Sequence, residues 1–182
     1  GFVGSSFFAM MKDRPGIGIH GVGRRPMPFA EYTRCDLSLP FDLDQTPDVV
    51  IHGAARSLPW GKAEEFHRQN VTATRNVIDF CERKGVKHLV YISSSSVFYR
   101  ERDQEGMTDE TPIGPEFVNH YARTKYEGEC LVRGFSGRSV ILRPRAVFGP
   151  GDTVLFPRIL AAALAGKMYR FERSGPPVKG DL

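Results

Sequence analysis

A tyrosine and a lysine four residues apart form the pair in this sequence with the clearest potential for chemistry. Tyr121 and Lys125 would lie on one face of a helix, because a helix brings residues i and i+4 together. A lysine ammonium beside a phenol favours the phenolate and lowers the pKa of the tyrosine. Such a tyrosine can act as a general acid or base toward an alcohol or a ketone. The same spacing also fits a half-buried tyrosine beside a surface lysine.

A serine tract, residues 93–96, follows the apolar run 88–93. If that run is a parallel strand, the tract lies beyond its carboxyl end, where open α/β sheets bind ligands. A serine hydroxyl there can hydrogen-bond a substrate oxygen and support developing charge. The alternative is a polar strand end without chemistry.

Two further segments suit a dinucleotide. The chain opens Gly1-Phe2-Val3-Gly4 and then becomes helical, and glycines so spaced let a backbone pass close to a pyrophosphate at a helix N-terminus. Arg24 and Arg25 follow a strand-like run. Arginine at that position suits the extra phosphate of NADP, whereas an acidic residue would favour NAD. An ordinary basic turn is the alternative for the two arginines.

The elements that must position these residues alternate along the chain. The strand-like runs are short and apolar, and they cover residues 16–22, 48–52, 88–93 and 139–143. Helix-like segments cover residues 5–12, 71–84, 121–132 and 156–165, and long loops are expected at 100–119 and 173–182. The alternation predicts an α/β fold, a doubly wound parallel sheet with helices on both faces. The near-continuous apolar character of the runs predicts strands that are buried on both faces.

Composition excludes several other classes of protein. No stretch approaches the about 20 apolar residues of a membrane helix. The net charge of +4 comes from scattered basic residues, which argues against a nucleic-acid surface. The cysteines, Cys35, Cys81 and Cys130, are too far apart to predict a disulfide framework or a zinc site. Reduced thiols are typical of a cytoplasmic protein, so we expect that location and no metal.

In combination and in order, the motifs resemble the extended short-chain dehydrogenase/reductase family, also called NAD-dependent epimerase/dehydratase. Residues 1–4 resemble the end of the family's GxxGxxG, without its first glycine. Residues 52–55 resemble HxAA, and residues 70–76 resemble NVxGTxN with Ala73 in place of glycine. Residues 142–152 resemble LRPxx(V)YGPGD, and Tyr121 with Lys125 matches YxxxK.

The resemblance implies a role for each matching residue. Tyr121 exchanges the proton, Lys125 tunes it and holds the nicotinamide ribose, and Ser94 binds the substrate oxygen, with Ser95 as the alternative hydroxyl. The implied cofactor is NADP or NAD, with NADP favoured by the arginines. The residues expected to bind it are Gly1, Phe2, Val3, Gly4, Arg24, Arg25, Asp36, Leu37, His52, Gly53, Ala54, Ala55, Asn70 and Lys125.

A Trp-Gly pair at residues 60–61, after the HxAA-like element, indicates a subgroup. Together with residues 142–145, it is similar to 3β-hydroxysteroid dehydrogenase-like proteins and bacterial 2-alkyl-3-oxoalkanoate reductases. Otherwise the tryptophan only packs within a loop beside the cofactor.

The family pattern also sets expectations about extent and function. Residues 1–182 are expected to be a partial NAD(P)-binding domain that lacks the family's first strand and its C-terminal substrate lobe, and so to be unstable or inactive alone. The expected function is an NAD(P)-dependent oxidoreductase acting on a small-molecule substrate. A sugar-nucleotide epimerase or dehydratase that holds NAD tightly and a non-catalytic dinucleotide-binding regulator are the alternatives. Family members often dimerise through two helices, so a homodimer is also expected.

Overall fold

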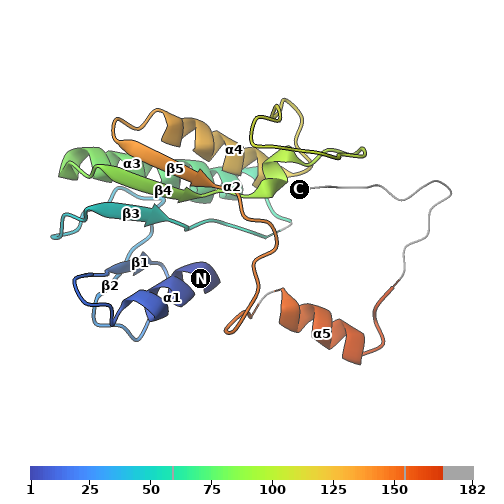
Figure 1. Ribbon diagram of the computed structural model, residues 1–182, viewed down its shortest axis with the longest axis horizontal. Helices are drawn as coiled ribbons and strands as arrows, with labels where there is room; N and C mark the ends of the chain where they lie inside the picture. The colour runs from blue at the N-terminus through green and yellow to red at the C-terminus, as the bar shows by residue number, and fades with distance from the viewer. Residues whose placement is uncertain (59, 154, 170–182) are drawn as a thin grey trace.

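The computed structural model describes residues 1–58, 60–153 and 155–169, so the loop expected at 173–182 lies outside the described residues. Strands alternate with helices along the chain (Figure 1). The strands are β1 Gly21–Gly23, β2 Tyr32–Arg34, β3 Val49–His52, β4 His88–Ile92 and β5 Arg138–Leu142. The helices are α1 Phe2–Met11, α2 Ala63–Phe66, the π-helical turn η1 His67–Thr72, α3 Ala73–Lys84, the 3₁₀ turn η2 Ser95–Phe98, α4 His120–Arg133 and α5 Phe156–Leu164.

All of these strands run parallel, which confirms the expected α/β class, but they form two sheets. β1 pairs with β2, β3–β4–β5 form a second sheet, and no described strand joins β1 to β3. The sequence did not predict β2, because its three residues, Tyr-Thr-Arg, carry no apolar run. The run expected at 16–22 is a strand only from Gly21, where it pairs with β2.

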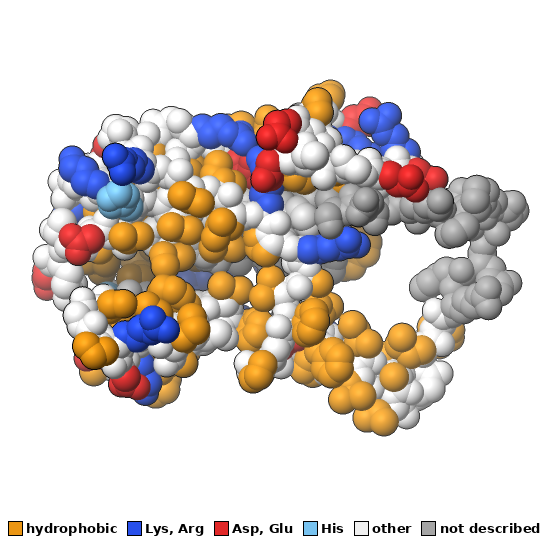
Figure 2. Space-filling view, viewed as in Figure 1, with side chains coloured by type: hydrophobic (Ala, Val, Ile, Leu, Met, Phe, Trp, Pro, Cys, Tyr) orange, Lys and Arg blue, Asp and Glu red, His pale blue; other side chains and the backbone are white. Residues whose placement is uncertain are grey.

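Only one face of the three-stranded sheet is covered. Helices α3 and α4 pack on it around a core made of Val77, Phe80, Cys81, Val86, Leu89, Tyr91, Val132 and Phe135. The opposite face keeps Val49, Ile51, Val140 and Leu142 between 44% and 54% exposed. Apolar side chains gather on that side of the molecule and on α5 (Figure 2). The expectation of strands buried on both faces is therefore wrong for β3 and β5, because nothing among the described residues covers their second face.

The helices of the covered face are longer than the sequence predicted. α2, η1 and α3 run on without a break over residues 63–84, where a helix was expected only from 71. The helix ends where expected, because Gly85 adopts a left-handed conformation with φ of 68°. α4 begins at the cap residue Asn119, whose side chain accepts a hydrogen bond of 2.8 Å from the Ala122 backbone.

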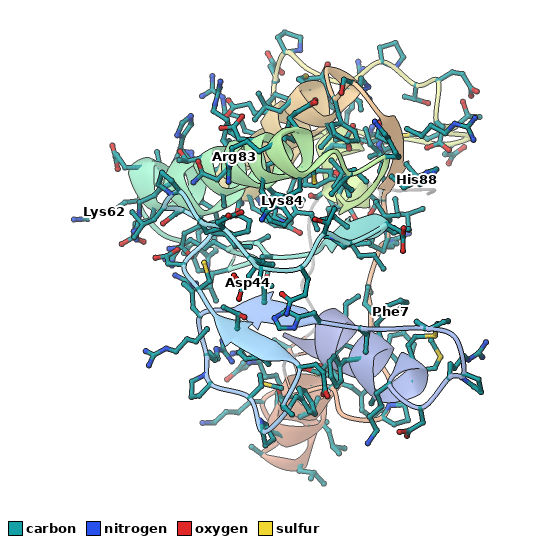
Figure 3. The ribbon with its side chains drawn as sticks, turned by 90° about the vertical axis from the view of Figure 1, so that its left-hand side faces the viewer. Phe7, Asp44, Lys62, Arg83, Lys84 and His88 are labelled. Atoms are coloured by element: carbon teal, nitrogen blue, oxygen red, sulfur yellow. The ribbon has the colours of Figure 1, made fainter. Side chains whose placement is uncertain are left out.

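In Figure 3, Phe7 on α1 lies on the other side of the strands from Arg83 and Lys84 on α3.

The parallel direction places the candidate residues at common edges. The segments that follow β3, β4 and β5 begin at Gly53, Ser93 and Arg143, and all three lie at the carboxyl edge of one sheet. Arg24 occupies the equivalent position after β1 in the other sheet. Ligands of open α/β sheets bind at this edge.

Candidate active site

Ser94 and Tyr121 meet at the carboxyl end of β4. Ser94 caps η2, where its hydroxyl accepts a hydrogen bond of 3.2 Å from the Ser96 backbone. The same hydroxyl hydrogen-bonds Tyr121, in the first turn of α4. Burial raises the pKa of Tyr121, and the bond from Ser94 opposes that rise. Tyr121 therefore stays a protonated phenol near neutral pH, held beside a hydroxyl at the ligand-binding edge.

Ser95, the alternative hydroxyl, contacts a different tyrosine. It is buried, and its Oγ lies 3.3 Å from the Tyr99 hydroxyl. The Ser96 hydroxyl is buried as well. Of the serine tract, Ser94 is the residue that contacts Tyr121, which favours the first choice made from the sequence.

Lys125 lies about one helical turn after Tyr121 on α4 and is only 1% exposed. Its ammonium donates a 2.6 Å hydrogen bond to the Ile92 carbonyl and lies 4.0 Å from the centre of the Tyr91 ring. Burial lowers the pKa of Lys125 to about 7. The bond to Ile92 uses one of the three N–H donors of the ammonium.

The position of Tyr91 depends on a glycine that the sequence did not single out. The Tyr91 hydroxyl lies within 3.4 Å of the Lys125 carbonyl, directly against Gly128. A Cβ at position 128 would overlap that hydroxyl. Gly128 thus allows α4 to approach β4 closely, and the Lys125 side chain is buried between these two elements.

Two residues expected to bind the cofactor use their side chains inside the protein instead. The buried His52 ring bonds the Thr74 hydroxyl at 3.0 Å, and burial lowers the pKa of His52 to about 3. Asn70 accepts from the Arg56 backbone at 2.7 Å and donates to Thr124 at 2.9 Å. A contact with a dinucleotide after β3 would therefore be made by the backbone of residues 53–55.

Several polar side chains converge where the adenosine half of a dinucleotide is expected. Arg24 donates to Gln69 at 2.9 Å, and Asp36 accepts from the Ser38 backbone and hydroxyl at 3.0 and 2.8 Å. The Ser38 bonds hold the pKa of Asp36 below its usual value, with help from Arg24 and Arg68. Arg25 is exposed, and its side chain makes no described contact with these residues. Leu37 packs against the core.

The glycine segment differs from the expected loop. The helix was expected from Ser5, but α1 begins at Phe2 with Gly1 as its cap, so Gly4 lies inside the first turn. The first backbone N–H groups of a helix have no partner within it and suit an anion. The Phe2 ring lies next to Gly149 and Gly151, which brings the segment after β5 to this helix end (Figure 1).

A pocket of about 540 Å³ opens beside the start of α4. Its lining is mixed: Trp60, Gly61, Pro115, Phe117 and Val118 stand beside the polar residues Asn119, His120 and Arg123. The Phe117 ring is held between Arg100 at 5.8 Å and the Tyr126 ring at 5.6 Å. The sequence predicted a role for the Trp-Gly pair but none for the loop that supplies the other wall.

The described part of the chain holds neither a cluster of three potential metal ligands nor a helix long and apolar enough to cross a membrane. Cys35, Cys81 and Cys130 are free thiols.

Comparison with known proteins identifies relatives of two kinds. The chain is 40% identical over 126 residues to a 2-alkyl-3-oxoalkanoate reductase of Stenotrophomonas maltophilia, which covers 66% of this chain and 38% of the relative. It is 40% identical over 128 residues to 3beta-hydroxysteroid-dehydrogenase/decarboxylase isoform 1 of Arabidopsis thaliana, covering 68% of this chain and 29% of the relative. The structure of MoeE5 in complex with UDP-glucuronic acid and NAD superimposes with a TM-score of 0.73 at 29% identity, over 92% of this chain and 60% of that one.

The chain thus spans well under half the length of either relative compared by sequence. The model of the NAD dependent epimerase/dehydratase family, in contrast, matches it almost from end to end, over residues 1–181. This match agrees with the parallel α/β fold. The chain belongs to the NAD dependent epimerase/dehydratase family.

Proposed function

We propose that the protein containing this chain is an NAD(P)-dependent oxidoreductase that transfers a hydride between nicotinamide and a carbon bearing a hydroxyl or keto group. The observation that carries the proposal is the hydrogen bond between Ser94 and Tyr121 at the carboxyl edge of the sheet. A tyrosine that stays protonated near neutral pH can donate a proton to a ketone oxygen as it is reduced.

Each of the three residues has a distinct role in this proposal. Tyr121 exchanges the proton with the substrate oxygen, and Ser94 hydrogen-bonds that oxygen as charge develops on it. Lys125 provides a positive charge next to Tyr121 and, with the N–H groups that Ile92 leaves free, a donor to the nicotinamide ribose. The dinucleotide supplies the hydride chemistry when it is bound.

The residues fit a dinucleotide along the carboxyl edge. The first turn of α1, whose backbone N–H groups have no partner within the helix, suits the pyrophosphate. The backbone of residues 53–55, at the carboxyl end of β3, is proposed to contact the dinucleotide as well. Arg24, near Asp36 and Gln69, suits the extra phosphate of NADP, so we propose NADP over NAD.

We propose an apolar substrate with an oxygen on its third carbon. The two relatives are named for a 3-oxoalkanoate and for a 3beta-hydroxysteroid, and both names place the oxygen at carbon 3 of a largely apolar molecule. The pocket beside the start of α4 includes the side chains of Trp60, Phe117 and Val118, which can contact an alkyl or ring system.

The remaining expectations concern the whole protein. We propose that the chain is its NAD(P)-binding part, with a further strand between β1 and β3 and a substrate lobe supplied by other segments. A homodimer is proposed from family analogy. A regulator without catalysis is the less economical alternative, since it would not need Ser94, Tyr121 and Lys125 together.

A second candidate is an epimerase or dehydratase acting on a sugar nucleotide, because the MoeE5 structure, 29% identical, contains UDP-glucuronic acid and NAD. Such enzymes reduce and reoxidise a retained NAD within one cycle. The identity of the bound dinucleotide, and whether the protein retains it, therefore distinguish the two candidate functions.

The test uses the whole protein, purified and then denatured to release any dinucleotide. The apoprotein is titrated with NADPH and NADH, and NADPH oxidation is followed with a 2-alkyl-3-oxo acid or with a UDP-sugar. An empty site that prefers NADPH and oxidises it with the oxo acid is the expected result. Tightly held NAD, with conversion of the UDP-sugar and no net oxidation, would establish the second candidate instead.

A further inference from the structure

A buried carboxylate lies one helical turn beyond Lys125. Glu129 on α4 is 0% exposed. It accepts hydrogen bonds from the Ser93 hydroxyl at 2.6 Å, from Arg143 Nε and Nη2 at 3.0 and 2.8 Å, and from Arg133 at 3.1 Å. Burying an ion is unfavourable unless it is paired and hydrogen-bonded, and here each carboxylate oxygen has two donors.

The donors come from the ends of two different strands. Ser93 directly precedes Ser94, the hydroxyl that contacts Tyr121. Arg143 directly follows β5, and its other side bonds Asp109 in the long loop before α4 at 3.1 Å. One carboxylate thus joins the ends of β4 and β5 to the helix that carries Tyr121 and Lys125.

The same carboxylate contributes to the charge around Lys125. Burial lowers the pKa of Lys125, and the negative charge of Glu129 opposes that effect. The other titratable groups that face this interior are Tyr121 on the same helix, Tyr91 on β4 and His52 on β3. The pKa of His52 is low and that of Tyr91 is high, so both are neutral near pH 7. Glu129 is the carboxylate that acts on Lys125, and the guanidinium groups of Arg133 and Arg143 partly offset its charge.

We propose that Glu129 is a positioning residue of the candidate active site, which fixes the end of β4 and the segment after β5 to α4. Because Glu129 lies one helical turn from Lys125 on α4, we also expect its carboxylate to favour the ammonium form of Lys125. The proposal rests on the proposed function of Ser94, Tyr121 and Lys125. Stability alone does not require the arrangement, since apolar residues of similar volume can replace buried ion pairs without loss.

The primary test is Glu129→Gln in the whole protein, with Glu127→Gln as the matched control. Glu127 lies on the same helix but is partly exposed and pairs with the exposed Arg123 at 3.4 Å. The first readout is the titration of Lys125 by NMR in lysine-labelled protein, with the signal assigned by its loss in Lys125→Met. This readout does not depend on turnover. We expect the Lys125 midpoint to fall in Glu129→Gln and to stay unchanged in Glu127→Gln.

The second readout is the pH profile of kcat. A fall of one unit in the Lys125 midpoint lowers its ammonium fraction about tenfold at pH values above both midpoints. We expect kcat of Glu129→Gln to fall by about this factor at alkaline pH, and the loss to shrink as the pH drops below the new midpoint. A loss that is equal at every pH, with an unchanged Lys125 midpoint, would reduce Glu129 to a packing residue and overturn its electrostatic role.

Ser93→Ala separates the two parts of the proposal and remains informative if Glu129→Gln does not fold. It keeps the carboxylate charge but removes the tie to β4. We expect a lower kcat at all pH values with an unchanged Lys125 midpoint. An unchanged kcat would contradict the positioning role. If the wild-type protein shows no redox activity, the proposed function fails, whereas the NMR titration still decides whether Glu129 sets the charge of Lys125.

Discussion

The two sheets of this protein differ sharply in how they are stabilised. The β3–β4–β5 sheet with α3 and α4 encloses the main core, and it holds the candidate proton-transfer residues. The β1–β2 sheet with α1 holds the segments proposed to bind the dinucleotide, yet Phe8 is the buried apolar side chain that it contributes. The candidate proton-transfer residues therefore lie on a packed core, whereas the segments proposed to bind the dinucleotide lie on a sheet with little buried apolar surface.

The largest expected effect on stability comes from two variants, each of which removes one aromatic ring from one of the two regions. Phe80 stacks on Phe41 within the core at 5.0 Å, and Phe8 stacks on Phe29 at 4.2 Å outside it. Phe80→Ala should lower the free energy of unfolding by about 3 to 5 kcal/mol, and Phe8→Ala by about 1 to 2 kcal/mol. Backbone hydrogen exchange of the whole protein should show lost protection throughout α3–β5 in the first variant and only in residues 1–34 in the second. Equal, global losses would mean that the two regions unfold as one unit.

Acid should destabilise the core region through His52. Its pKa is about 3 in the folded protein against an ordinary value of 6.5, so between these values the unfolded chain binds a proton that the folded one does not. Stability should therefore fall as the pH drops through this window, by about 1.4 kcal/mol per pH unit from this group. Unfolding titrations at several pH values measure the slope, and His52→Gln should flatten it. The same slope in that variant would assign the acid sensitivity to other groups.

The buried charge of Lys125 should lower the free energy of unfolding, although the proposed function requires this residue. Its folded pKa of about 7 lies below its ordinary 10.5, so the unfolded chain binds more protons between these values and stability rises with pH across them. Lys125→Met should raise the free energy of unfolding at pH 7 by about 1 to 2 kcal/mol and eliminate turnover. A loss of stability in the thermal unfolding of this variant would show that the bond to Ile92 outweighs the burial of charge.

The smallest expected effect lies in α1. A Cβ at Gly4 meets no neighbouring atom, so Gly4→Ala should stabilise this helix by about 0.5 to 1 kcal/mol. If the pyrophosphate lies against the first turn, the added methyl group should nevertheless weaken binding of NADPH, measured by fluorescence titration. Met11→Ala, at the other end of α1, serves as the control and should leave binding unchanged. An unaltered affinity for NADPH in Gly4→Ala would contradict the proposed position of the pyrophosphate at this helix.

The sequence predicted the elements with strong periodic signals. β3, β4 and β5 are apolar runs, and α3 has the apolar stripe and the Gly85 stop that define a helix. β2 is too short for such a signal, and no pattern distinguishes a strand buried on both faces from one that is bare on its second face, as with Val140.

The candidate site was predictable only in part. The spacing of Tyr121 and Lys125 indicated a shared helix face, but four consecutive serines look alike in sequence, and the contact with Tyr121 distinguishes Ser94. Glu129 was missed because a glutamate on a helix is ordinarily a solvated charge. Its partners, Ser93 and Arg143, come from separate strands and meet only in the fold.

The central claim is that Tyr121 exchanges a proton during hydride transfer, and Tyr121→Phe tests it most directly. The variant keeps the ring and loses the hydroxyl, so NADPH binding measured by titration should be unchanged. Turnover with the 3-oxo acid should fall on the order of 10²- to 10⁴-fold, the usual contribution of a general acid. Unchanged turnover in a folded variant that binds NADPH would remove Tyr121 from the mechanism and contradict this account.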